Sequence, residues 1–466
     1  MESAIRYSPY NAHLKISAIR VYGELNAAAR SWELFQTMFI KHIQFESCSY
    51  LILPVLQSGA LYQETISVCK EIIRLQRAAV QDAGEFSGRA LENGALSKAD
   101  EFIQFHLNRM NRSLTTLEAK GLILDAAPLF VQTEKQGSVG ALHGIVGGAT
   151  DFARAKQIIG EAHDPFATFS LLRLRGHAKE VVHHFAENRD LSVLAHELIS
   201  PRRVPSAEEI VADSIRRGQL HGLLIRAALC LEAAKGPKKG KIVPASQVLR
   251  KRCSSLLAAV AQADTDCAND DGKPEQAHLM KVVLGHCRII AAVSGGLWAE
   301  SQCLEVDTLE IREEHASSLL GKILLDLKTG KELITSSGAL SVGEVSRLLP
   351  EHIIPVFAVF QMCAEVFDLF GWGARKRKTK KCAAGLADVS LVMSDLIREM
   401  QAVCPSKISD SCISEFHQAV LTPGLIEASD LEETRAVISH ARGVTAYRLD
   451  KVLTELKSRL DSFNVQ

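Results

Sequence analysis

The chain has 466 residues, of which 47% are hydrophobic and 6% aromatic, and its 54 lysines and arginines balance 54 aspartates and glutamates. This composition supplies enough apolar side chains for a continuous core and excludes a chain that is disordered throughout. The zero net charge excludes a uniformly basic nucleic-acid coat and an acidic tail, so polyanion binding must come from a local patch. The 11 cysteines include no Cys-x-x-Cys pair, which predicts buried free thiols in a reducing compartment.

The sequence shows no targeting segment or membrane span. The amino terminus is polar, and no uninterrupted apolar run reaches the roughly 18 residues that a membrane helix needs. The nearest candidate, residues 352–370, contains Pro355, Gln361, Glu365 and Asp368, and we interpret it as a buried helix. We therefore expect a cytoplasmic protein.

The amino-terminal part of the sequence has the pattern of paired helices. Apolar residues recur every three or four positions and strand-like alternation is scarce, so the predicted fold class is all-α. Turns about 35 residues apart are typical of an α-solenoid of antiparallel helix pairs, here with degenerate tetratricopeptide-like repeats. The helices expected in this part cover residues 11–22, 28–38, 47–57, 62–79 and 98–114.

Later helices are predicted from their start signals and from their apolar stripes. In a capping box, a serine and a glutamate three residues later bind free amides of the first helical turn. The chain has this spacing at Ser206 and Glu209, at Ser341 and Glu344, and at Ser429 and Glu432. Near the carboxyl end, an apolar stripe of helical period comprises Leu449, Val452, Leu453, Leu456 and Leu460.

Polar stretches divide the chain into six segments. The predicted segments are tetratricopeptide-like helical pairs over residues 1–130, a helical-repeat continuation with a glycine-rich loop over 131–263, a polar loop over 264–275, helices over 276–370, a basic loop over 371–385 and carboxyl-terminal helices over 386–466. Because the pattern remains helical on both sides of each loop, we interpret the loops as insertions in one array.

The strongest charge cluster lies in the predicted basic loop. Six cations occur within seven residues and are candidates for binding a polyanion or the ribosome: Arg375, Lys376, Arg377, Lys378, Lys380 and Lys381. Such a cluster binds phosphates by releasing condensed counterions. Three interpretations remain open, namely a solvated loop, a signal resembling a nuclear-localisation sequence, and an RNA or ribosome contact.

Two further clusters have the composition of a site but lack its spacing. His183 and Glu187 are four residues apart on a predicted helix, as two metal ligands would be, but no third ligand follows at a fixed spacing. The glycine-rich residues 137–148 lack both common phosphate-loop patterns, and we interpret them as an inter-helix loop. The sequence therefore predicts no metal site and no cofactor.

One short motif points to a different class of protein. Residues 173–178 read Arg-Leu-Arg-Gly-His-Ala and fit the R-x-x-G-x-A signature with which GNAT-fold acetyltransferases bind the pyrophosphate of acetyl-CoA. A match to three constrained positions is common by chance in a chain of this length. The strands that the fold requires are also not evident, so we expect no catalytic residue here.

Several motifs resemble one known family, the non-catalytic auxiliary subunit of the N-terminal acetyltransferase B (NatB) complex. The resemblance is specific in the first 130 residues and looser beyond them, and this chain would correspond to the carboxyl-terminal part of the family's plan. The motifs that carry it are residues 40–44 (IKHIQ), 49–54 (SYLILP), 99–105 (ADEFIQF), 111–114 (NRSL) and 187–191 (ENRDL), with the basic run after Gly371-Trp372-Gly373.

The resemblance implies that this chain is a scaffold and not an enzyme. In that family the auxiliary subunit is a helical solenoid that wraps a separate GNAT-fold catalytic subunit and is thought to bring it to the ribosome. The complex acetylates nascent chains that begin Met-Asp, Met-Glu, Met-Asn or Met-Gln. The implied partners are therefore the catalytic subunit and the ribosome or its RNA, with no membrane and no DNA.

We expect residues 40–54 and 99–114 to lie mostly in the core, and functional contacts to fall on the concave surface and on the basic run. Two alternatives differ in class. One is a general helical-repeat scaffold for protein interactions, unrelated to acetylation. The other is an acetyltransferase in its own right, for which turnover without a partner would be the evidence.

Overall fold

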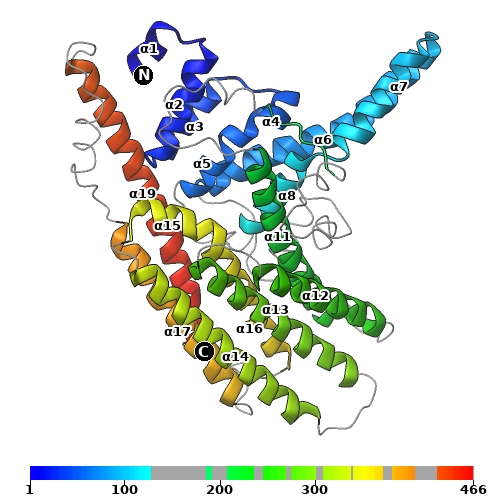
Figure 1. Ribbon diagram of the computed structural model, residues 1–466, viewed down its shortest axis with the longest axis vertical. Coiled ribbons are helices and arrows are strands. Elements are labelled where there is room, and N and C mark those ends of the chain that lie inside the picture. The colour runs from blue at the N-terminus through cyan, green and yellow to red at the C-terminus, as the bar shows by residue number, and fades with distance from the viewer. Residues whose placement is uncertain are drawn as a thin grey trace.

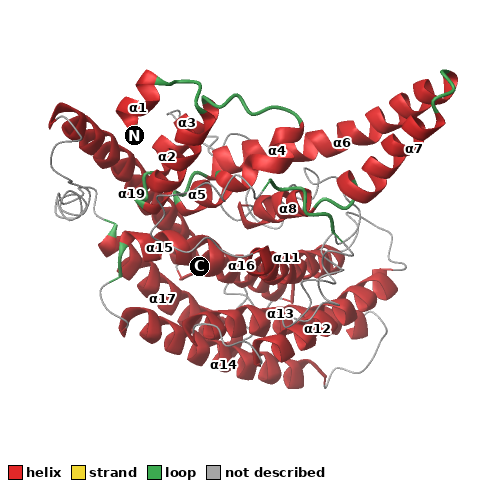
Figure 2. Ribbon diagram, turned by 45° about the horizontal axis from the view of Figure 1, so that its top comes forward, coloured by secondary structure: helices red, strands yellow, loops and turns green. Residues whose placement is uncertain are grey.

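The computed structural model describes residues 1–126, 185–190, 207–235, 245–268, 274–300, 308–336, 340–370, 380–404 and 428–464. These residues are almost entirely helical (Figures 1 and 2), and the β-type pairing among them is one isolated bridge between Ser113 and Ala186. The predicted all-α solenoid is confirmed. The helices are α1 (Glu2–Tyr7), α2 (Ala12–Glu24), α3 (Ala28–Gln36), α4 (Ile43–Cys48), α5 (Leu53–Ser58), α6 (Tyr62–Glu92), α7 (Leu96–Phe105), α8 (Leu114–Ala126), α11 (Ala207–Lys235), α12 (Ala245–Ala268), α13 (Pro274–Glu300), α14 (Thr308–Ser336), α15 (Val342–Leu348), α16 (Ile354–Phe370), α17 (Lys380–Val403) and α19 (Ala428–Asn464).

Local signals start two helices, α2 and α15, where the sequence predicts them, whereas the helix predicted over residues 47–57 is divided between α4 and α5 and the one predicted over 62–79 continues to Glu92. The side chain of Asn11 accepts a hydrogen bond from the amide of Leu14 and so caps α2 at its amino end. At Ser341 the capping box predicted from the sequence is complete. Its hydroxyl accepts from the Glu344 amide, and the Glu344 carboxylate accepts from the Ser341 amide.

The helices after residue 207 stack in chain order. Helix α12 packs between α11 and α13, α14 packs between α13 and α17, and α17 packs against α19. Figure 2 shows these helices side by side as a curved layer below the amino-terminal helices. This neighbour-to-neighbour packing is the arrangement of a solenoid, in which each helix buries its apolar face on the next one.

Helix α16 lies inside this stack, against α11 and α13, and its side chains form the centre of the core. The rings of Phe357, Phe360 and Phe367 are fully buried. Among the described residues, two segments are long and apolar enough to cross a membrane, Gln276–Ser294 and Val342–Phe367, and they are 67% and 78% buried. Runs of that length were not expected from the sequence, whereas the interpretation of residues 352–370 as a buried helix is confirmed.

The last helix connects the two ends of the described structure. The predicted apolar stripe on α19 is confirmed, since Leu449, Leu453, Leu456 and Leu460 have no exposed surface. They pack against α17, and the other end of α19 reaches α1 and α3 (Figure 1). The Arg448 guanidinium also pairs with the Glu64 carboxylate of α6 at 3.3 Å.

Two predicted loops are shorter in the structure. The polar loop of residues 264–275 was predicted too long, because α12 continues to Ala268 and α13 begins at Pro274. Asp264, near the end of α12, pairs there with Arg288 of α13. The basic loop of residues 371–385 was also predicted too long. Helix α17 begins at Lys380 because Cys382 and Gly385 pack into the stack, Gly385 against Leu320.

The expectation that residues 40–54 and 99–114 lie mostly in the core was wrong in both places. Residues 51–53 are buried, but residues 41–44 are exposed. Helix α6 runs on to Glu92 and forms with α7 a hairpin that projects away from the other helices (Figures 1 and 2). Its apolar residues therefore have few neighbours, and of residues 99–109 only Ala99 is buried.

Candidate functional site

The basic run that the sequence singled out falls largely outside the described residues. This applies to Arg375, Lys376, Arg377 and Lys378, and the structure gives the backbone but not the side chains of Lys380 and Lys381 at the start of α17. The glycine-rich residues 137–148, the R-x-x-G-x-A motif and His183 also lie outside. The expectations for these segments stay predictions.

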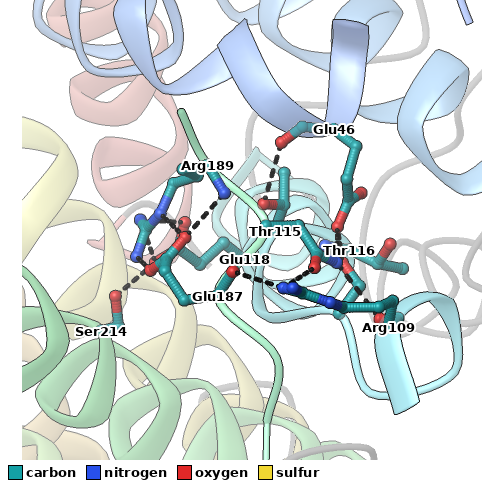
Figure 3. A network of polar contacts seen from close by, with 10 residues as sticks. Glu46, Arg109, Thr115, Thr116, Glu118, Glu187, Arg189 and Ser214 are labelled. Carbon is teal, nitrogen blue, oxygen red and sulfur yellow. Dashed lines mark hydrogen bonds and ion pairs between the residues drawn. The ribbon is translucent and has the colours of Figure 1, made fainter. Parts of the chain in front are cut away.

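The structure shows instead a buried polar junction at residues 187–190, a motif quoted above for its family resemblance. We define the polar junction as Glu46, Ser113, Glu118, Asn188, Arg189 and Glu187 with their direct partners (Figure 3). These residues come from α4, from the start of α8 and from residues 185–190. Residues far apart in the sequence therefore meet at one place in the first part of the fold.

One half of the polar junction is built on the carboxylate of Glu46, which is 1% exposed. Its Oε1 accepts hydrogen bonds from the Ser113 hydroxyl and, at 2.9 Å, from the Asn188 amide. The backbone carbonyl of Glu46 accepts from the Thr115 hydroxyl at 3.2 Å. Burial raises the pKa of Glu46 above its ordinary value, although the hydrogen bonds from Ser113 and Asn188 favour the charged form.

The other half is built on the guanidinium of Arg189, whose side chain is 5% exposed. It pairs with Glu118 at 3.1 Å and also with Glu187. Burial alone would lower the pKa of Arg189, but the two carboxylates outweigh it and raise the pKa above the usual range. The Ser214 hydroxyl of α11 donates to the same Glu118 carboxylate, so the pair also ties α8 to α11.

The backbone of residues 185–190 is fixed at both ends of this junction. The Ala186 amide donates to the Arg112 carbonyl at 2.7 Å. Further along, the Asp190 amide donates to the Ser47 carbonyl at 2.9 Å, and the Tyr50 hydroxyl donates to the Asp190 carbonyl at 2.7 Å. The junction therefore joins α4 and α8 through one short segment, and Glu118 of α8 extends it to Ser214 of α11. Arg189 is paired with two carboxylates, whereas the Glu46 carboxylate is bound by the neutral side chains of Ser113 and Asn188. These contacts hold the helices in fixed positions relative to one another.

A cleft of about 690 Å³ opens next to these helices, between α2 and α5 on one side and α11, α13 and α15 on the other. Arginines and carboxylates share its lining. The Arg217 guanidinium lies 3.7 Å from the Glu351 carboxylate, and Arg347 lies 4.0 Å from the same group. Burial, together with the charges of Arg347 and Arg216, lowers the pKa of His352 to about 4, so this imidazole is neutral at neutral pH. The nearly balanced charge singles out no ligand.

The family motifs at residues 111–114 and 187–191 include two segments of the polar junction, whereas Glu46 and Glu118 lie outside every motif that the sequence offers. The Asn188–Asp190 motif was noticed for its family resemblance, without a structural role. Nothing in the local sequence marks Glu46 or Glu118. Each lies on a helix, and the spacing of apolar residues does not decide whether its side chain faces the core or the solvent. A buried ion pair between residues 71 positions apart has no signal in a single sequence.

The family resemblance is confirmed at the amino-terminal end of the chain. Residues 1–120 match the family model of the "N-acetyltransferase B complex (NatB) non catalytic subunit". The human and rat proteins named "N-alpha-acetyltransferase 25, NatB auxiliary subunit" are each 32% identical over 114 residues, which is 24% of this chain and 12% of the relative. The family that residues 1–120 match is the non-catalytic one.

The fold extends the likeness to nearly the whole chain. A chain in the solved structure "The NatB Acetyltransferase Complex Bound To bisubstrate inhibitor" superposes with a TM-score of 0.55 at 12% sequence identity. The superposition covers 97% of this chain and 50% of the solved chain, so the present chain spans about half the length of the protein whose fold it shares.

Proposed function

We propose that this chain is an auxiliary scaffold subunit of a NatB-type complex, which binds a separate GNAT-fold catalytic subunit and positions it for acetylation of nascent amino termini. The observation that carries the proposal is the match of residues 1–120 to the non-catalytic subunit family. The shared fold is compatible with it, since a solenoid offers a long surface on which a second protein can lie.

The polar junction supports this role physically. A scaffold positions its partner only if its own helices keep a fixed relation to one another. The contacts of Glu46 and Arg189 fix α4, α8 and α11 at the place where the matched segment joins the later stack. In this proposal the chain contributes placement and stability, and the partner contributes the chemistry and binds acetyl-CoA.

The test is an acetylation assay on purified proteins. The chain alone, the catalytic subunit alone and the reconstituted pair are each given acetyl-CoA and a peptide that begins Met-Asp. We expect turnover from the pair to exceed that of the catalytic subunit alone, and none from the chain alone. Turnover by the chain alone would support the alternative of an independent acetyltransferase. No effect of the chain on its partner would support the alternative of a scaffold unrelated to acetylation.

The finer part of the proposal is that the complex works in the cytoplasm at the ribosome, and that the basic run makes the contact. Its test is co-sedimentation with ribosomes after the six cations Arg375, Lys376, Arg377, Lys378, Lys380 and Lys381 are changed to glutamine. We expect weaker co-sedimentation and a shallower dependence on salt. The slope of the logarithm of the binding constant against the logarithm of the salt concentration should fall by up to about 0.9 per lost phosphate contact. Unchanged co-sedimentation would leave the run as a solvated loop.

A further inference from the structure

The helical hairpin formed by the second half of α6 and by α7 carries an unusual amount of exposed apolar surface. Of eighteen large apolar side chains that the described residues expose, eight lie between residues 80 and 107. Single exposed apolar residues are normal, whereas a contiguous patch marks an interaction site. The residues concerned are Val80, Phe86, Leu91, Leu96, Phe102, Ile103, Phe105 and Leu107.

The two helices of the hairpin meet through small side chains. Ser87 of α6 and Ala99 of α7 are the buried residues of this region. To one side of that contact, the rings of Phe86 and Phe102 lie against each other with centroids 5.7 Å apart. Phe86 and Phe102 thus partly cover each other and are 43% and 37% exposed, whereas Leu91 and Leu96 on the opposite side are 52% and 69% exposed.

Helix geometry assigns the residues of that opposite side. Each residue advances an α-helix by about 100°. Gly88 and Leu91, one and four positions after Ser87, therefore lie on the side away from Phe86. By the same reasoning, Leu96 and Ile103, three residues before and four after Ala99, lie on the side away from Phe102. We call these residues, together with the glycine one turn earlier on α6, the hairpin face: Gly84, Gly88, Leu91, Leu96 and Ile103.

The hairpin face is flat on one helix and apolar on the other. A side chain added at Gly84 or Gly88 would meet no atom within 4 Å, so the backbone of α6 is open to close approach there. Leu96 is 69% exposed and Ile103 is 41% exposed. Two glycines beside an apolar stripe let the backbone of a second helix come near while its apolar side chains cover Leu96 and Ile103.

The charges around the hairpin face select the partner. Residues 80–105 carry five acidic and two basic side chains, all exposed, which gives a net charge of −3 in a chain whose total is zero. Both basic groups are paired within the hairpin, Arg89 with Glu85 and Lys98 with Glu101. Of the remaining acidic groups, Glu92 and Asp100 lie toward the hairpin face by the same helix geometry, and Asp82 lies on the side of Phe86.

We propose that the hairpin face docks a basic amphipathic helix of another protein, whose apolar stripe covers Leu96 and Ile103 while its lysines and arginines lie near the acidic groups. This mode of recognition is that of an amphipathic helix laid along an apolar surface, with complementary charge setting orientation and rate. The inference rests on the hairpin alone and does not depend on the proposed NatB function.

The test uses the full chain and two synthetic helical peptides as probes. Both peptides carry the same leucine stripe at helical spacing, flanked by lysine and arginine in one and by glutamate in the other. Fluorescence anisotropy measures the affinity of each peptide for the chain. We expect the basic peptide to bind at least about tenfold more tightly than the acidic one, and the difference to shrink as salt is added.

Variants locate the binding. Ile103→Asp should weaken binding of the basic peptide by about tenfold or more. Leu325→Asp, at an apolar position on α14 that is more exposed (67% against 41%), should leave it unchanged. Gly84→Leu and Gly88→Leu fill the hairpin face without removing any native contact. They should also weaken binding, and because they replace glycine within a helix they should not destabilise the chain.

Three results would overturn the proposal. The first is equal affinity for the two peptides, and the second is no binding of the basic peptide at the highest chain concentration reached. The third is self-association of the chain, measured by light scattering, that Ile103→Asp and Gly88→Leu abolish. That result would assign the hairpin face to a second copy of the chain.

Discussion

Helix α6 belongs to two regions with opposite character. Its first half packs against α8 and contributes Ile66, Ile72 and Ile73 to the core, beside the polar junction. Its second half pairs with α7, and the helical hairpin that they form projects away from the other described helices (Figure 1). Both regions lie within the 120 residues that match one family. One stretch of related sequence therefore contains a buried base and an exposed arm.

The comparison shows that an amphipathic pattern predicts a helix with an apolar face but not whether another helix covers that face. The apolar spacing in α6 continues from the base into the arm, but only the base has helices to cover it. Stability should therefore depend on residues at the base, while substitutions in the arm should alter binding and leave folding nearly unchanged. Three matched pairs of variants can break or sharpen this distinction, and a fourth pair tests the burial of Glu46.

The largest effect is expected at the ion pairs of the polar junction. Arg189→Ala leaves the carboxylates of Glu118 and Glu187 partly buried without their cation, which should cost about 3–5 kcal/mol of unfolding free energy. Arg89→Ala removes an exposed pair with Glu85 in the arm and should cost less than about 0.5 kcal/mol. Urea denaturation of both variants measures the difference, and equal losses would contradict the burial of these ion pairs.

A leucine at the base should outweigh a leucine in the arm. Leu124 is 1% exposed, so Leu124→Ala should lower the unfolding free energy by about 2–5 kcal/mol through lost burial and the cavity left behind. Leu96→Ala, at a position 69% exposed, should change it by no more than about 0.5 kcal/mol. A large loss from Leu96→Ala would mean that the arm packs against the body of the protein.

Alanine substitutions at two glycines on neighbouring helices should change the stability with opposite signs. A methyl group at Gly121 of α8 would lie 2.2 Å from the ring of His221, which is hydrogen-bonded to Asp125 at 2.9 Å. Gly121→Ala should therefore destabilise by about 1–3 kcal/mol. Gly84→Ala meets no neighbour and should stabilise the chain by about 0.5–1 kcal/mol, because alanine favours the helix. Thermal denaturation gives both signs, and a stabilising Gly121→Ala would contradict the close packing of α8 on α11.

The smallest effect concerns the pH dependence of stability. Because the pKa of Glu46 is raised on folding, this carboxyl stabilises the fold fully below its unfolded pKa and less as the pH rises through its folded pKa. Glu46→Gln, which cannot ionise, should therefore gain in unfolding free energy relative to the natural chain as the pH is raised from about 4.5, the ordinary value.

Glu2 supplies the control of opposite sign. Burial would raise the pKa of Glu2, but hydrogen bonds from Arg30 and Tyr22 lower it overall. Glu2→Gln should therefore lose in unfolding free energy relative to the natural chain as the pH rises toward about 4.5 from below, and the difference should stay constant above that value. Urea denaturation across pH gives both trends, and parallel trends for the two variants would show that the Glu46 carboxylate is not desolvated.

Local features of this fold were predictable from the sequence, and distant ones were not. The Ser341–Glu344 capping box and the apolar stripe of α19 depend on residues within a few turns, so their spacing predicts them. The exposure of Ile103 depends on whether another helix lies over it, which periodicity does not record. For the same reason residues 99–107 were assigned to the core and are mostly exposed.

The site was less predictable than the fold. The basic run stood out because charge is visible in a sequence, whereas the polar junction joins Glu46 to a residue 142 positions away. Three of its contacts involve a serine or a threonine, residue types too common to mark a site. The resemblance of residues 111–114 and 187–191 to a family points to this place, without indicating the partners Glu46 on α4 and Glu118 on α8.

The most direct test of the scaffold role is the formation of a complex in solution. The purified chain is mixed with a NatB catalytic subunit, and the mass of the species formed is measured by size-exclusion chromatography with light scattering. The account predicts a stable species that contains both proteins, and predicts that Arg189→Ala reduces its yield while Arg89→Ala does not. Two proteins that elute separately at every concentration tested, with both intact and folded, would contradict it.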